Sequence, residues 1–194
     1  MDCRVTALDL HTALLREAAA LLAADGDQRW DELLPIIRHF EGHDLQCWQD
    51  LAMATLEAMV AGNACELLGR DPWCAVAPLM TRLLRRLARH APADPRRAVR
   101  AICRLFEHLR EAEPLTLPDG LPGATVLLAK ALPDHRALLV SSFSRMVDGE
   151  RLAVLLACGR TTRHELRALR QVADDAALQE AIDTTLDHAA LPNG

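Results

Sequence analysis

Four side chains that bind metals or transfer protons lie in one short segment. His39, His43 and Cys47 are spaced by four residues, and an unbroken helix would place them on one side, within reach of a metal ion. Glu41 lies between the two histidines. Gly42 interrupts the series, and glycine commonly ends a helix. We therefore predict no metal site here and expect the histidines to lie at the surface or in a turn.

The familiar motifs of hydrolases and nucleotide-binding proteins are missing from the sequence. Ser141, Ser142 and Ser144 follow His135, but no Gly-x-Ser-x-Gly elbow surrounds them. The chain also has no Gly-x-x-x-x-Gly-Lys-Ser/Thr or Gly-x-Gly-x-x-Gly loop. These observations favour a non-enzymatic protein without a bound cofactor.

One short string resembles a known family. Pro133-Asp134-His135 is similar to the Pro-Asp-His string of the TorD/NarJ family, cytosolic all-helical chaperones that bind redox-enzyme precursors. The resemblance covers three residues and implies a chaperone role. Asp134 also stands where we expect a helix cap, so we do not assign the sequence to that family.

Arginine is concentrated in the middle of the chain, between two acidic segments. Residues 1–70 carry 5 cationic and 12 acidic side chains, a net charge of −7. Residues 71–112 carry 9 and 4, a net charge of +5, and residues 113–194 carry 8 and 11, a net charge of −3. If the two helices expected in the middle segment form an antiparallel hairpin, their polar faces combine into one cationic strip. The candidate partner-binding residues of this strip are Arg82, Arg85, Arg86, Arg89, Arg96, Arg100 and Arg104.

The cationic strip has three interpretations. Arginine makes bidentate contacts with carboxylates and phosphates, so the strip suits an acidic surface of another protein. The strip is also what an ordinary solvated helix face looks like, and the acidic first 70 residues would cover part of it within the same fold. Nucleic-acid binding is the least favoured, because such domains are usually basic and the isoelectric point here is about 5.9.

The elements that must position these residues are predicted to be helices throughout. Apolar residues recur at spacings of three and four from end to end. Helix-start patterns punctuate them, including Thr162 with Glu165, Asn63 with Glu66, and Asp94 before a proline. We predict an all-α fold of about ten helices, arranged as an irregular multi-helix bundle or a short stack of helical hairpins.

A segment rich in proline and glycine, residues 113–123, is the only obvious linker. We predict a single helical domain over residues 1–194. The segment makes a subdivision possible, into a main bundle over 1–112 and a C-terminal helical subdomain over 124–194. The next helix is expected near residues 126–132.

The composition points to the bacterial cytoplasm. The six cysteines form no Cys-x-x-Cys pair, which argues against a disulfide framework. No signal peptide is evident and no run of about 18 apolar residues occurs, so no membrane span is expected. Lys130 is the only lysine, and arginine, alanine and leucine are abundant, as in proteins from GC-rich bacterial genomes.

We rank a protein-binding adaptor, chaperone or assembly component first among function classes. The partner is another protein, with an acidic surface that would fit the strip, and a homo-oligomer is compatible with the sequence. The alternative is a small-molecule-binding protein or helical enzyme with an apolar pocket between helices. A nucleic-acid-binding regulator comes third.

Overall fold

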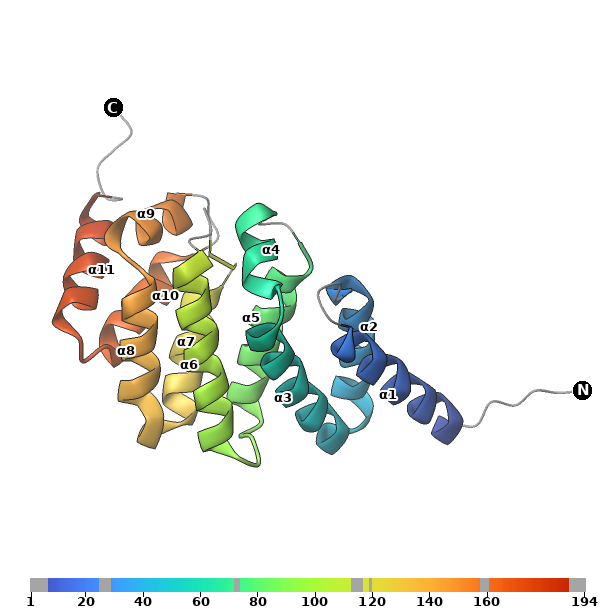
Figure 1. Ribbon diagram of the computed structural model, residues 1–194. Helices are drawn as coiled ribbons and strands as arrows, with labels where there is room; N and C mark the ends of the chain where they lie inside the picture. Colours follow the sequence, from blue (N-terminus) through green and yellow to red (C-terminus); the bar gives the residue numbers. More distant parts are fainter. Residues whose placement is uncertain are drawn as a thin grey trace, which may run out of the picture.

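The computed structural model describes six parts of the chain: residues 7–24, 29–71, 74–112, 117–118, 120–157 and 161–188. Within these parts every regular element is a helix, and they comprise eleven α-helices and one short 3₁₀ helix (Figure 1). The all-α class and the approximate number of helices predicted from the sequence are confirmed.

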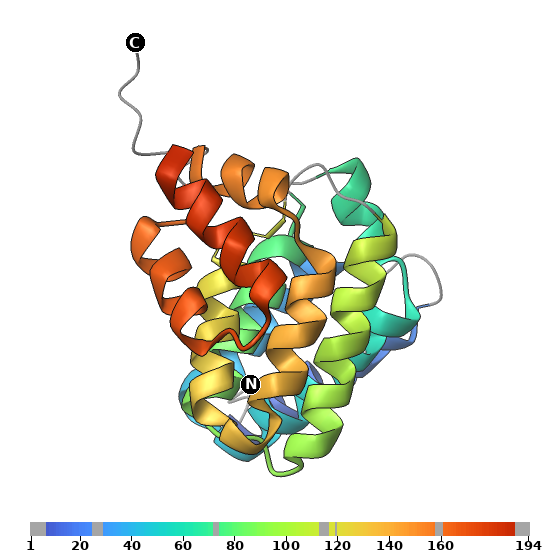
Figure 2. The same ribbon diagram turned by 90° about the vertical axis from the view of Figure 1, so that its left-hand side faces the viewer.

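Most of the helices are arranged in two layers. The first layer consists of α1 (Ala7–Ala23), α3 (Leu45–Ala61), α6 (Pro95–Ala112) and α8 (Arg136–Met146). The second consists of α2 (Trp30–His43), α5 (Val76–Arg89), α7 (Leu121–Ala131) and α10 (Arg163–Val172). In the first layer α3 packs on α6 and α6 on α8, and in the second α5 packs on α7 and α7 on α10. Figure 2, seen from the C-terminal end of the stack, shows α6 and α8 on one side and α7 and α10 on the other.

The remaining helices cover the edges of this stack. The short helix α4 (Ala64–Arg70) contacts α3, α5 and α6. At the C-terminal end, α9 (Gly149–Ala157) and α11 (Ala176–His188) pack together, and α11 also contacts α10. The 3₁₀ helix (Pro133–His135) joins α7 to α8. Helices α1 and α11 therefore lie at opposite ends of the stack (Figure 1).

Side-chain caps explain where several helices begin. The Thr162 hydroxyl accepts a hydrogen bond from the Glu165 N–H, and the Glu165 carboxylate accepts one from the Thr162 N–H, both at 3.1 Å. The predicted capping box is thereby confirmed. Asp94 likewise accepts from the Arg97 N–H at 3.0 Å, as expected at the start of α6. Asn63 occupies the N-cap position of α4, as predicted, but its backbone (φ −94°, ψ 11°) is not extended and its side chain makes no cap hydrogen bond, so the predicted capping contact is not formed.

Helix α7 begins earlier than the sequence suggested. It starts at Leu121, with Pro122 in its first turn, where the missing proline N–H leaves no helical hydrogen bond unmade. Gly120 precedes it in the left-handed region, at φ 69°. Because α7 packs on α5 and α8 on α6, the helices before and after the proline- and glycine-rich segment share one hydrophobic core. Residues 113–116 and 119 of that segment lie outside the described residues.

The core contains mainly leucine, alanine and valine, with a few large aromatic anchors. Phe40, Phe106 and Phe143 have no exposed surface, and Trp48 is 1% exposed. The rings of Phe106 on α6 and Phe143 on α8 meet edge to face, with their centroids 5.8 Å apart. This contact joins adjacent helices of the first layer. The apolar spacing of the sequence also predicts that Trp73 is buried, but this residue lies outside the described residues.

Two cysteines belong to this core, where a free thiol behaves as a small apolar side chain. Cys65 and Cys103 are buried and free. Burial raises the pKa of the Cys65 thiol to about 12, which keeps it protonated and unreactive at neutral pH. Cys3 and Cys158 lie outside the described residues.

Helix length bears on the membrane prediction. Within the described ranges, no single helix is long and apolar enough to cross a membrane. Only α3 and α4 counted together have sufficient length and apolar composition, and they are bent by 66° where they meet.

The aromatic contact between α6 and α8 predicts a large effect on stability. Replacing the fully buried Phe106 with alanine should lower the free energy of unfolding by roughly 3–5 kcal/mol, because it removes apolar contacts and leaves a cavity. Leu138→Ala is the control, since Leu138 on α8 is 47% exposed, and should change it by less than about 0.5 kcal/mol. Urea denaturation measures the free energy of unfolding of both variants. Equal decreases would contradict the placement of Phe106 in the core.

Candidate binding surfaces

The arginines of α5 are largely neutralised by carboxylates from neighbouring helices. Glu41 of α2 has a side chain only 8% exposed and forms ion pairs with both Arg82 and Arg86. The Arg82 Nε donates to the Glu41 carboxylate at 2.6 Å. One buried carboxylate thus lies under two guanidinium groups, and breaking such a pair by removing one partner leaves an uncompensated charge.

Arg85 of α5 forms an ion pair with Glu165 of α10. Both helices pack on α7, so this pair links two neighbours of that helix. The Arg85 Nη2 donates to Glu165 Oε1 at 3.4 Å, while Glu165 Oε2 makes the capping bond to Thr162. Gly120, which precedes α7, and Gly123 in its first turn make room for this arrangement. A Cβ atom at Gly120 would lie 2.2 Å from the Arg85 guanidinium, and one at Gly123 would lie 2.3 Å from the Glu165 carboxylate. Any larger residue at either position must displace the ion pair.

Arg89 differs from the other cations of α5. It lies at the end of the helix, is exposed, and has no acidic partner among the described residues. With Arg82, Arg85 and Arg86 it lines a groove of about 360 Å³, which we call the α2–α5 groove and which Glu41 also lines. Three of its four arginines already contact carboxylates of the same chain.

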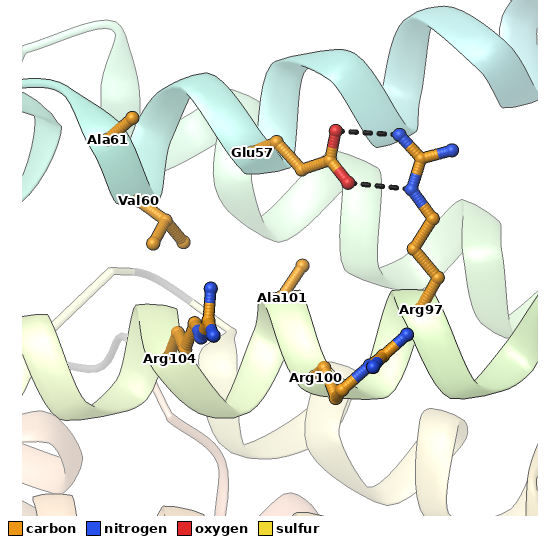
Figure 3. Close-up of a pocket in the computed structure, with 7 residues that line it drawn as sticks. All are labelled: Glu57, Val60, Ala61, Arg97, Arg100, Ala101 and Arg104. Carbon is orange, nitrogen blue, oxygen red and sulfur yellow. Dashed lines mark hydrogen bonds and ion pairs between the residues drawn. The ribbon is translucent and has the colours of Figure 1, made fainter.

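The arginines of α6 line a separate groove against α3. This α3–α6 groove has a volume of about 410 Å³ and is lined by Glu57, Val60, Ala61, Arg97, Arg100, Ala101 and Arg104. Arg97 makes a bidentate pair with Glu57, with both N–O distances 2.7 Å (Figure 3). The Arg97 guanidinium holds the pKa of the Glu57 carboxyl below its usual value of 4.5.

Arg100 and Arg104 are the uncompensated cations of the α3–α6 groove. Both are exposed, lie one helical turn apart, and have no acidic partner among the described residues. Figure 3 shows Arg104 pointing up between the two helices, close to Val60, and the Arg100 side chain running along the floor toward Arg97. In the described part of the chain, the groove therefore combines two guanidinium groups that lack a carboxylate partner with the apolar side chains of Val60, Ala61 and Ala101.

The structure separates the arginines that the sequence placed on one strip. Helix α5 packs mainly on α7, in the second layer, and α6 packs mainly on α3 and α8, in the first. The hypothesised hairpin with a joint outer face is not formed, because each helix turns its apolar stripe toward the middle of the stack and its polar face outward from its own layer. Arg82, Arg85, Arg86 and Arg89 line one groove, and Arg100 and Arg104 line the other. Arg96 is exposed and lines neither.

Sequence reasoning missed Arg97 and the carboxylates that select among the arginines. In the sequence, Glu41 stands out only as a neighbour of the histidines, and no pattern marks Glu57 or Glu165 as a partner of an arginine. A local signal existed for Arg97, which precedes Arg100 by three residues and Arg104 by seven and so shares their helix face. The pairing itself had no local signal.

The histidine segment is organised differently from the prediction. Helix α2 continues through Gly42 to His43, so the expected break at that glycine is wrong. His39 and His43 stack with ring centroids 4.5 Å apart, and His11 of α1 meets His39 edge on at 5.1 Å. Burial, with the two neighbouring histidines, lowers the pKa of His39. Cys47 lies on the next helix, α3.

No metal site emerges from this arrangement. Among the residues that the structure describes, no group of three or more histidine, cysteine or acidic side chains is placed to hold a metal ion. The hydrogen bond from the His43 ring to the His39 carbonyl, at 2.7 Å, is a local contact within α2.

Comparisons with protein-family models, with curated proteins and with solved structures find no match to this chain. The three-residue resemblance to the TorD/NarJ chaperones thus has no wider match behind it. Asp134, expected to cap a helix, lies instead in the 3₁₀ helix, and His135 occupies the cap position of α8 without a side-chain cap bond.

The Glu57–Arg97 pair predicts a measurable change in titration. In an Arg97→Gln variant the pKa of Glu57 should rise toward 4.5, because the stabilising guanidinium is gone. Since the folded-state pKa is the lowered one, the pair stabilises the native protein above the unfolded-state pKa and loses this effect as the pH falls through the folded-state value. NMR titration of the side-chain carboxyl measures it. Arg100→Gln is the control and should leave Glu57 unchanged.

Glu165 predicts a graded loss of stability. Glu165→Ala removes both the Arg85 contact and the capping box, and should lower the free energy of unfolding by about 1–2 kcal/mol. Glu165→Gln keeps a side chain that can close the capping box, so only the exposed ion pair is lost and the decrease should stay below about 1 kcal/mol. Urea denaturation of the two variants compares them. Equal losses would show that the cap contributes nothing.

Proposed function

We propose that this protein is a non-enzymatic adaptor, chaperone or assembly component that binds another protein through the α3–α6 groove. The observation that carries the proposal is the pair Arg100 and Arg104, two exposed guanidinium groups one turn apart without a carboxylate partner among the described residues. A guanidinium group binds a carboxylate in bidentate fashion, as Arg97 already does with Glu57. An acidic segment of a partner would extend this arrangement along the groove.

The α3–α6 groove suits this role better than the α2–α5 groove. In the latter, Glu41 and Glu165 already pair with three of the four arginines, so an acidic ligand would have to displace carboxylates of the same chain. In the α3–α6 groove Glu57 pairs with one arginine only. The apolar side chains of Val60, Ala61 and Ala101 add a surface for the hydrophobic residues that occupy the centre of protein interfaces.

The cytoplasmic location, the bacterial origin and the possibility of a homo-oligomer stay predictions from the sequence. The alternative function, binding of a small molecule between helices, also stays a prediction. The α3–α6 groove, on which the proposed function is based, lies on the surface of the helical stack.

The proposal predicts that charge reversal in the groove abolishes partner binding. The tagged wild-type protein should retain one stoichiometric protein partner from its native host, and an Arg100→Glu/Arg104→Glu variant should retain at least about tenfold less, because the cations now repel acidic side chains. Arg167→Glu is the matched control, since Arg167 of α10 is exposed and lies outside both grooves. Quantitative mass spectrometry of the bound fractions measures the difference.

Two results would contradict the proposal. The double variant would retain the same partner as the wild type if the groove played no part. Bound nucleic acid that nuclease treatment removes, with no protein left behind, would place the chain in the nucleic-acid-binding class instead.

A further inference from the structure

Helix α3 borders a groove on each of its two flanks: the α3–α6 groove on one and a largely apolar groove against α1 on the other. This α1–α3 groove has a volume of about 540 Å³. Its lining residues are Leu15, Ala19, Leu22 and Ala23 of α1 and Cys47, Asp50, Leu51, Ala54 and Ala58 of α3. Leu15 is 37% exposed at its edge, and Leu10 of the same helix is 45% exposed. Apolar residues gathered at a surface hollow are typical of a binding site for another molecule.

The two grooves open on the same face of the molecule. Helices α1, α3 and α6 are consecutive members of the first layer, with α3 in the middle (Figure 1). Ala58 lines the α1–α3 groove and the adjacent Glu57 lines the α3–α6 groove. Only the solvent-facing side of α3 separates them. A ligand lying along α3 would contact the apolar groove on one flank and the free arginines on the other.

We infer that this face binds one amphipathic helix of a partner protein, which carries a row of apolar residues and a row of acidic residues along one flank. The inference rests on the proposed function and names the chemistry of the partner. The apolar row enters the α1–α3 groove, and the acidic row pairs with Arg100 and Arg104.

Two rows of different character on neighbouring flanks favour a helix over an extended segment, in which successive side chains point to opposite faces. Arg100 and Arg104 repeat after one turn of α6, a rise of about 6 Å, and acidic side chains four residues apart on a bound helix repeat at the same distance. A helix also presents its apolar residues as a separate row, at spacings of three and four, as binding in a groove requires.

Charge complementarity also fixes which flank of the bound helix is acidic. Asp50 is exposed and lines the α1–α3 groove, where its carboxylate accepts a hydrogen bond from the Gln46 amide at 3.4 Å. Its negative charge also helps to raise the pKa of Arg97, so it reaches the α3–α6 groove as well. An acidic row on the α1 side would meet Asp50 without a nearby cation of that groove, whereas one on the α6 side meets Arg100 and Arg104. Like charges brought together at an interface disfavour the reversed orientation.

Synthetic helical peptides of about four turns test the inference on the full-length protein. The first carries leucines at every third and fourth position with glutamates along one flank. The second has lysines in place of those glutamates, and the third is a scrambled version of the first, with the same composition but no apolar row. Fluorescence polarisation measures binding. We expect the first peptide to bind at least about tenfold more tightly than either of the others.

Two protein variants separate the apolar and the charged contributions. Leu15→Asp places a charge in the α1–α3 groove at an exposed position, and Arg100→Glu/Arg104→Glu reverses the charge in the α3–α6 groove. Each should weaken binding of the acidic amphipathic peptide at least about tenfold, while Arg167→Glu should not change it. Circular dichroism confirms that the variants remain folded.

The outcomes distinguish this inference from the proposed function. If the scrambled acidic peptide binds as well as the first and only the arginine variant weakens it, the inference is overturned and the function survives. If no peptide binds and the arginine variant still loses its native partner, the inference is likewise overturned and the function survives. If the arginine variant keeps both the peptide and the native partner, the inference and the proposed function are both overturned.

Two other occupants of the face would also overturn the inference. Binding of the wild-type protein to vesicles of anionic phospholipid, lost in both variants, would assign the face to a membrane surface. Self-association in analytical ultracentrifugation, abolished by the arginine variant, would assign it to a second copy of the chain.

Discussion

The burial of one apolar stripe from each helix of the two layers, in the space between those layers, is the constraint on which the rest of the structure depends. Leu83 and Leu87 of α5 and Phe106 and Leu109 of α6 are completely buried, so the arginines of each helix must point away from the centre. Because α5 and α6 belong to different layers, their arginines line separate grooves. The division of the cationic residues into two grooves is thus a consequence of core packing.

The helices were predictable because their signals are local. Apolar residues at spacings of three and four, and caps such as Thr162 and Asp94, involve residues within one or two turns of each other. The errors have local causes as well. Glycine is tolerated inside a helix, so Gly42 did not end α2, and proline fits the first turn, so Pro122 did not delay α7. At a glycine or proline the local sequence is therefore compatible with more than one helix boundary, and tertiary packing selects one of them.

The candidate site was predictable only in part, because its decisive contacts are distant in the sequence. The arginine-rich segment was visible, but Arg82 pairs with a glutamate 41 residues away, Arg97 with one 40 residues away and Arg85 with one 80 residues away. No periodicity or spacing specifies these pairs. They depend on the order of the helices within each layer, which a single sequence does not give.

A count of charges along the chain therefore overstates the cationic surface. The middle segment has a net charge of +5, yet Glu41, Glu57 and Glu165, which all lie outside that segment, occupy four of its nine arginines. The acidic first 70 residues supply two of these carboxylates, as the sequence interpretation of a covered strip anticipated. A side chain that already has a carboxylate partner gains little from a second one. The arginines available to an acidic ligand are those that folding leaves without a counter-charge, and within the described parts of the chain Arg100 and Arg104 are such arginines of the α3–α6 groove.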